Sequence, residues 1–92
     1  MNRNDTSPQF ELIRVGIKEG AITTMQEVIR VMGIVIAIDL LKIHHKTLTK
    51  KMYNPELFTF ADAWRLADIL GMEPEDIMKL ISREMKKNKA VK

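Results

Sequence analysis

The sequence predicts an all-α protein, a compact bundle of about five or six short helices in one domain. Apolar residues recur three and four positions apart over most of the chain, which is the spacing of a helix with one buried side. Glycine or proline interrupts these segments at intervals that suit short helices. With 92 residues, of which 46% are hydrophobic, the chain has enough apolar material for one core.

The two ends of the chain differ in composition from its middle. Residues 1–8 are polar, include Pro8 and show no periodicity, so we expect a flexible arm there. Residues 86–92 are rich in lysine and predict a basic, flexible tail. Residues 9–85 between them form the predicted single domain.

The first segment of the domain, residues 9–19, fits two structures. Phe10, Ile13 and Ile17 recur at helical spacing and predict a helix. The β-branched residues around Val15 also alternate as in a strand, and a sheet-forming arm explains the segment equally well. The sequence leaves both structures open.

Two further helices are predicted at residues 25–32 and 34–41. A threonine at position 23 or 24 caps the first of them, since Glu27 lies in its first turn. Gly33 separates the two helices. The second is apolar on nearly every side except at Asp39, so we expect it to be buried among the other helices.

The next segment, residues 44–53, predicts a helix with one packed side and one free side. Leu48 and Met52 lie four positions apart and are expected in the core, whereas polar residues occupy positions 45, 46, 49 and 50. Asn54 and Pro55 then form a turn, because proline disfavours a helical residue before it.

The last two helices have clear starting signals. Thr59, followed three positions later by Asp62, resembles a capping box, and Pro74 is favoured at a first helical position. Gly71 ends the first of these helices. Its core side is expected to consist of Phe60, Ala63, Trp64, Ala67 and Leu70. Trp64 is thus predicted as a core residue rather than a stacking platform.

Composition and charge exclude several classes of protein. The absence of cysteine excludes disulfides, thiolate catalysis and cysteine-based zinc sites. The longest apolar stretch, residues 31–38, is far too short to span a bilayer, and the first residues do not resemble a signal peptide, so a cytoplasmic location is expected. The net charge of +3 is modest. Residues 42–53, however, hold four lysines and no acidic residue.

The sequence at residues 41–48, Leu-Lys-Ile-His-His-Lys-Thr-Leu, resembles the centre of the Cro/repressor-type (XRE-like) helix-turn-helix family of small bacterial and phage regulators. The family pattern there is Leu-Gly-Ile-Ser-x-x-Thr-Leu, and residues 54–77 are similar to the segment that follows it. The similarity covers about residues 23–82. Two positions depart from the pattern: Lys42 replaces the turn glycine, and Ile34 stands where a phosphate-anchoring glutamine is usual.

The resemblance implies a lambda-repressor-like fold and a regulator of transcription that binds double-stranded DNA as a homodimer on an inverted repeat. Its recognition helix, residues 44–53, enters the major groove with its free side. By position, the expected base contacts are His45, Lys46, Thr49 and Lys50. The expected phosphate contacts are Lys42, His44, Lys51 and Tyr53. For the dimer surface, the sequence offers Met78 and Met85, seven positions apart on the last helix, or residues 10–17.

Other functions find less support in the sequence. A protein-interaction or adaptor module on the same fold is the alternative, since fold does not fix function. Enzyme activity is not expected, because the sequence has no glycine-rich phosphate loop, nucleophile elbow or metal-ligand spacing. His44 and His45 are adjacent, so on a helix they point about 100° apart and do not form a metal site. No cofactor or small-molecule ligand is indicated.

Overall fold

A computed structural model describes residues 8–91 of the chain, and its side chains up to residue 88. Within these residues there are α-helices and one short 3₁₀ helix, but no strand, so the predicted all-α bundle is confirmed. The elements are α1 (Pro8–Lys18), α2 (Met25–Met32), α3 (Ile34–Leu41), α4 (His45–Tyr53), η2 (Pro55–Leu57), α5 (Phe60–Leu70) and α6 (Pro74–Val91). No helix in this part of the chain is long and apolar enough to cross a membrane.

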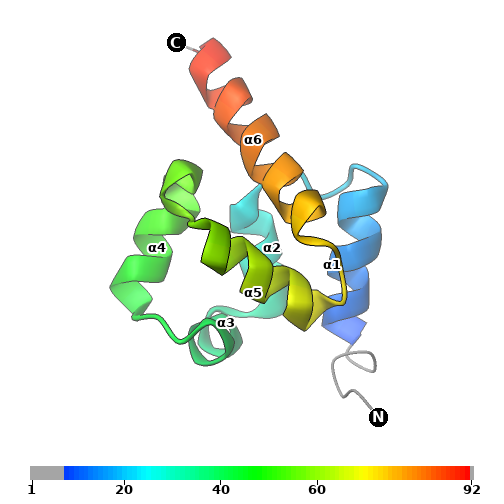
Figure 1. Ribbon diagram of the computed structural model, residues 1–92, viewed down its shortest axis with the longest axis vertical. Helices are drawn as coiled ribbons and strands as arrows, with labels where there is room; N and C mark the ends of the chain where they lie inside the picture. The colour runs from blue at the N-terminus through cyan, green and yellow to red at the C-terminus, as the bar shows by residue number, and fades with distance from the viewer. Residues whose placement is uncertain (1–7, 92) are drawn as a thin grey trace.

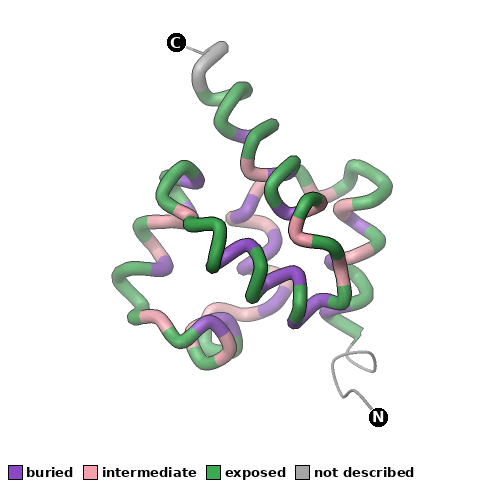
Figure 2. The backbone as a smooth tube through the Cα atoms, in the orientation of Figure 1, coloured by how far each residue is buried: buried purple, intermediate pink, exposed green. Residues whose placement is uncertain are grey.

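The helices surround one core (Figure 1, Figure 2). Helix α5 crosses the middle of the molecule, with α1 and α4 on opposite sides of it, and α6 packs along α5. The second half of α6 extends beyond the rest of the fold. Buried positions lie on the inner sides of the helices, as Figure 2 shows. The largest fully buried side chains are Ile13, Met25, Ile29, Met32, Leu41, Leu48, Leu66, Leu70 and Ile77.

Local capping explains where α2 and α5 begin. The Thr24 hydroxyl accepts a hydrogen bond of 3.1 Å from the Glu27 amide, while the Glu27 carboxylate accepts one of 2.9 Å from the Thr23 amide. At α5 the capping is fully reciprocal, because the Thr59 hydroxyl accepts from the Asp62 amide and the Asp62 carboxylate accepts from the Thr59 amide, at 3.0 Å each. Each arrangement satisfies amides that the first turn of a helix leaves unpaired, as the sequence predicted.

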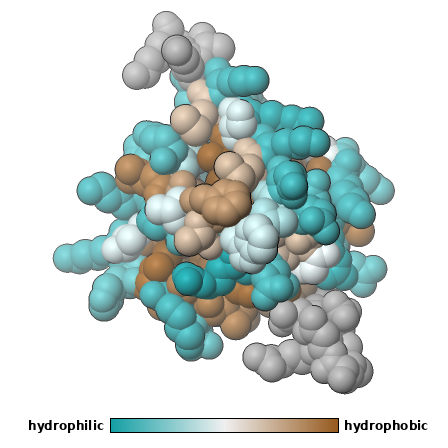
Figure 3. Space-filling view, viewed as in Figure 1, coloured by the Kyte–Doolittle hydropathy of each residue, from teal (hydrophilic) through white to brown (hydrophobic). Residues whose placement is uncertain are grey.

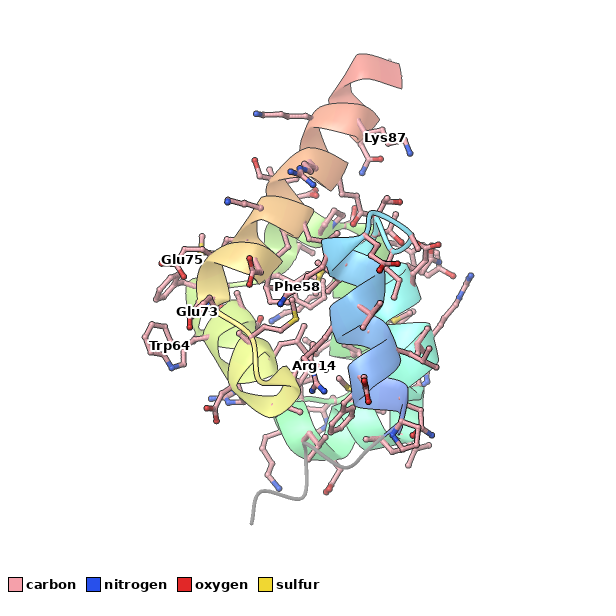
Figure 4. The ribbon with its side chains drawn as sticks, turned by 90° about the vertical axis from the view of Figure 1, so that its right-hand side faces the viewer. Arg14, Phe58, Trp64, Glu73, Glu75 and Lys87 are labelled. Atoms are coloured by element: carbon pink, nitrogen blue, oxygen red, sulfur yellow. The ribbon has the colours of Figure 1, made fainter. Side chains whose placement is uncertain are left out.

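Side chains from distant helices satisfy other helix ends. The Arg14 guanidinium of α1, which Figure 4 shows between α1 and α5, donates to the last carbonyl of α5, Leu70, at 2.8 Å. Arg65 of α5 donates to the Leu41 carbonyl at the end of α3, at 3.2 Å. The buried Glu84 carboxylate of α6 accepts from the Met25 amide at the start of α2, at 2.9 Å. These charges have the signs that the helix dipoles favour.

A glycine allows the connection between α1 and α2 to pass close to α1. A Cβ atom on Gly16 would lie only 2.7 Å from the Ile22 side chain. The Gly16 carbonyl also accepts the amides of Ala21 and Ile22, at 2.8 and 2.9 Å. Any larger residue at position 16 therefore forces the Ile22 side chain to move.

At both ends of the domain the structure decides what the sequence left open or predicted differently. Residues 9–19 lie in α1, so the helical alternative is correct and the strand alternative is wrong. Helix α6 continues to Val91, past the point at which a flexible tail was predicted, because Lys86 and its neighbours favour the C-terminal end of a helix dipole. The predicted flexible arm lies, apart from Pro8 in α1, outside the described residues.

The predicted burial of α3 is wrong, whereas the predicted core side of α5 is right at Ala63, Ala67 and Leu70 and wrong at Phe60 and Trp64. In α3 only Ala37 and Leu41 are buried, whereas Val35 is 78% exposed and Ile36 is also exposed. In α5 the aromatic residues Phe60 and Trp64 lie outside the core. Asp62, Leu66 and Ile69 complete the buried side of α5, next to the three residues that were predicted correctly.

The side chain of Leu48 anchors α4 to the core, and it is fully buried. We expect Leu48→Ala to lower the free energy of unfolding by about 2–5 kcal/mol, because a large-to-small change leaves a cavity. Leu12→Ala, at a position that is 63% exposed on α1, is the matched control and should change it by less than about 0.5 kcal/mol. Urea denaturation measures both values. Equal losses in the two variants would contradict the assigned orientation of α4.

Candidate nucleic-acid interface

Helices α3 and α4 are joined by a tight turn of residues 42–44. Lys42 adopts the left-handed conformation, with φ 58° and ψ 45°, and its amide donates to the Ile38 carbonyl. Ile43 packs against the core from the middle of the turn. His44 is the N-cap of α4, so the helix begins at His45, one position after the predicted start at residue 44. Lys42 thus takes the backbone role of a turn glycine while keeping a cation there.

The core side of α4 determines which residues face solvent. Leu48 and Met52 are buried, as predicted, and they turn Lys46 and Lys50 outward. Tyr53, which is 63% exposed, follows Lys50 by three positions and shares its side of the helix. Lys46, Lys50 and Tyr53 therefore form one exposed stripe, to which His45 adds an exposed side chain at the start of the helix.

Lys51 is not a free surface cation, contrary to its expected role as a phosphate contact. Its ammonium donates to the Asp62 carboxylate, and both side chains are largely buried. Burial acts to raise the pKa of Asp62, but the Lys51 ammonium and the Thr59 amide and hydroxyl outweigh it and hold the pKa below its ordinary value. The ion pair joins α4 to the start of α5, since Asp62 also completes the α5 capping box.

Thr49 differs from its expected role in another way. Thr49 is only partly exposed, and its hydroxyl oxygen is buried without a hydrogen-bond partner among the described residues. A hydroxyl in that position does not present a donor to a groove in the way that the exposed Lys46 and Lys50 do. Thr49 therefore lies at the edge of the exposed stripe rather than within it.

The electrostatic character of this side of the molecule is positive. Lys42, Lys46 and Lys50 are all exposed, and Asp39 is the acidic residue nearest to them in the sequence. The start of α4 adds a second positive feature, because the His44 side chain makes no capping hydrogen bond and leaves the first amides of the helix available. Among the residues described, no group of acidic, histidine or cysteine side chains is arranged to hold a metal ion.

Sequence reasoning missed two features beside this stripe. Helix α3 exposes Val35 and Ile36. Because this helix is apolar on nearly every side, its sequence does not show which side faces solvent. The Lys51–Asp62 pair joins residues eleven positions apart on different helices, and no local pattern announces such a contact. The Thr59 capping signal did point to Asp62 as a structural acid.

The left-handed Lys42 allows a test of the turn. We expect Lys42→Gly to raise the free energy of unfolding by about 0.5–1 kcal/mol. Glycine removes the cost of about 1–2 kcal/mol that a left-handed non-glycine residue carries. It also increases the conformational entropy of the unfolded chain, which cancels part of that gain. Lys42→Ala removes the same charge but keeps the strain, so it should bring no gain. Thermal or urea unfolding compares the two, and an equal effect would argue against the left-handed turn.

The ion pair predicts a pH dependence of stability. Because the pKa of Asp62 is lower in the folded than in the unfolded protein, its charged form stabilises the fold above the unfolded pKa of about 4, and this contribution is lost as the pH falls through the folded pKa. Asp62→Asn should thus be less stable than wild type near neutral pH, and the difference should shrink below about pH 4. Urea denaturation across this range measures it. A difference independent of pH would contradict this account.

Comparisons with known proteins leave the interface to be judged on its geometry. The chain matches no family model, no curated protein and no solved structure. The observations available for a functional assignment are therefore the turn at Lys42, the exposed stripe on α4 and the resemblance of residues 41–48 to a helix-turn-helix.

Proposed function

We propose that the protein is a regulator of transcription that binds double-stranded DNA, as a homodimer on an inverted repeat, with α4 as its recognition helix. The observation that carries the proposal is the exposed stripe of Lys46, Lys50 and Tyr53 on a helix whose other side is fixed in the core. A helix that enters the major groove needs such a side, free of core residues and rich in donors.

The position of α4 within the fold supports the same function. Helix α4 lies at one edge of the molecule, on the side opposite α1, where a DNA duplex has access to it (Figure 1). Lys46 and Lys50 are long cations that suit the O6 and N7 atoms of guanine. Lys42 and the unpaired amides at the start of α4 suit phosphates on either side of the groove.

The ion pair refines the set of contacts. Lys51 is withdrawn from the interface, since its ammonium is held by Asp62. We therefore assign base contact to His45, Lys46 and Lys50, and phosphate contact to Lys42, His44 and Tyr53. Thr49 contributes to the shape of the helix surface rather than a hydrogen bond to a base.

The proposal is tested by binding to DNA selected from random or genomic fragments with the purified protein. Lys46→Ala and Lys50→Ala are expected to weaken binding to the selected site by about 1–3 kcal/mol each. Lys79→Ala, an exposed lysine on α6, is the matched control for loss of charge and should have a much smaller effect. Titration by fluorescence anisotropy gives the dissociation constants.

The salt dependence of the same titration provides a further criterion. Neutralised phosphates release counterions, so affinity should fall steeply between about 50 and 200 mM salt. Absence of DNA binding at low salt would sink the proposal. Equal losses in the three alanine variants would instead show that α4 is not the recognition helix.

One observation favours a second candidate function, a protein-interaction module on the same scaffold. Val35 and Ile36 expose aliphatic surface on α3, the helix that precedes the turn. Ile34 also begins this helix at the position where the helix-turn-helix regulators that residues 41–48 resemble carry a phosphate-binding glutamine. An adaptor of this kind would bind no DNA at low salt, and Val35→Ser would weaken its association with a protein partner.

A further inference from the structure

An exposed aromatic surface lies on the side of α5 that the sequence assigned to the core. Phe60 and Trp64 are 58% and 57% exposed, and their rings contact each other with centroids 5.8 Å apart. Met78 of α6 is 43% exposed and lines a shallow pocket of about 160 Å³ together with both rings. Figure 3 shows apolar side chains gathered over the middle of this side of the molecule. We call Phe60, Trp64 and Met78 the aromatic surface.

Acidic side chains surround the aromatic surface. Glu73 and Glu75 line the same pocket, and Figure 4 shows them on the same side of the molecule as Trp64. Asp68 lines a neighbouring hollow beside Phe60 and Trp64. The hollow also contains one basic residue, Arg65, whose guanidinium donates to the Leu41 carbonyl, so the three carboxylates outnumber it. The surface therefore suits a partner that is apolar and positively charged.

The second half of α6 has this chemistry. Met85 is 42% exposed and lies seven positions after Met78, so the two share nearly the same side of the helix. Lys86 is exposed and lies eleven positions after Glu75, which is three helical turns and places the two side chains along one flank of the methionines. This half of α6 extends beyond the rest of the fold and is open to a partner (Figure 1).

We propose that the aromatic surface binds the second half of α6 from a second copy of this chain, with the two α6 helices antiparallel. In this dimer Met85 of each copy packs against Met78 and Trp64 of the other, and Lys86 of each copy lies beside Glu75 of the other. The proposal rests on the dimer of the proposed function and names its interface.

Charge complementarity selects the antiparallel orientation. In an antiparallel pair of helices, a flank of one helix faces the same flank of the other. Glu75 and Lys86 share a flank, and pairs formed by Glu75 with Lys86 and by Met78 with Met85 have their centres within one residue of each other. A parallel pair would bring the acidic starts of both helices together, and their basic ends as well, which is unfavourable.

Trp64 reports on this interface, because it is the only tryptophan in the chain. Sedimentation equilibrium of the full chain without DNA should show a monomer–dimer equilibrium. As the dimer forms with rising concentration, the emission of Trp64 should shift to shorter wavelength and its quenching by acrylamide should decrease, since the indole ring leaves water. A monomer at every concentration overturns the proposal, and so does a dimer in which Trp64 stays as accessible as in the monomer.

Charge reversal tests the orientation. Glu75→Lys and Lys86→Glu should each weaken the dimer by about tenfold at low salt, because the two-fold axis repeats each lost contact. An equimolar mixture of the two variants should regain nearly wild-type affinity, since in the mixed dimer position 75 of each copy faces an opposite charge at position 86 of the other. Circular dichroism establishes that each variant is folded before its dimerisation is compared.

Matched controls carry the same changes of charge elsewhere. Lys87→Glu alters the neighbouring residue, whose side chain lines the groove between α6 and α1 instead, and Glu19→Lys alters an exposed acid after α1. Both should dimerise as wild type does. If the controls weaken the dimer as much as the test variants, or if the mixture is not rescued, the antiparallel interface is wrong.

The outcome for DNA binding is independent of this one. A wild-type protein that stays monomeric but binds DNA in a salt-dependent way would refute the interface and leave the recognition helix in place. A dimer with the expected behaviour of Trp64, but without DNA binding, would support the interface and refute the proposed function.

Discussion

The ion pair between Lys51 and Asp62 fixes the rotation of α4, and the candidate interface depends on that rotation. Asp62 accepts from Lys51 and from the Thr59 amide, so one carboxylate both starts α5 and holds α4. Turning α4 to expose Lys51 would withdraw Leu48 from the core and leave Asp62 buried without its cation. Both changes are costly. The positions that face solvent on α4 are consequently decided by the burial of Leu48 and Met52 together with the ion pair to α5.

The same dependence on neighbouring helices extends through the fold. Helices α2, α3 and α4 are each only eight or nine residues long, which is too short for stable isolated helices. Glu84 supports the start of α2, and Arg65 supports the end of α3. Both charges come from α5 or α6, so these two long helices hold the three short ones in place. A site built on α4 is thus positioned by residues that never touch its exposed stripe.

The sequence was sufficient for what is local and insufficient for what is distant. The helix ends at Thr24, Gly33 and Thr59 depend on contacts between residues at most four positions apart, so the sequence alone was enough to predict them. The exposure of Phe60 and Trp64 could not be predicted, because these two residues continue the three-and-four spacing of Ala63, Ala67 and Leu70, which do lie in the core. The positions of α1, α3 and α6, which all pack against α5, decide which residues are buried. Likewise, the sequence does not distinguish Lys51 from the exposed lysines near it, because its partner Asp62 lies on a different helix.

The separation of charge gives the two proposed surfaces different partners. Exposed lysines gather at α4 and its preceding turn, whereas Glu73, Glu75 and Asp68 surround the aromatic surface on α5 and α6. A duplex bound as proposed would be attracted to the first surface and repelled by the second, and it would not stack on Trp64 even though aromatic rings stack well on bases. The acidic residues therefore favour a positively charged protein partner at the aromatic surface. The second half of α6 supplies that charge from within the same sequence, which makes a second copy of the chain the partner most directly available.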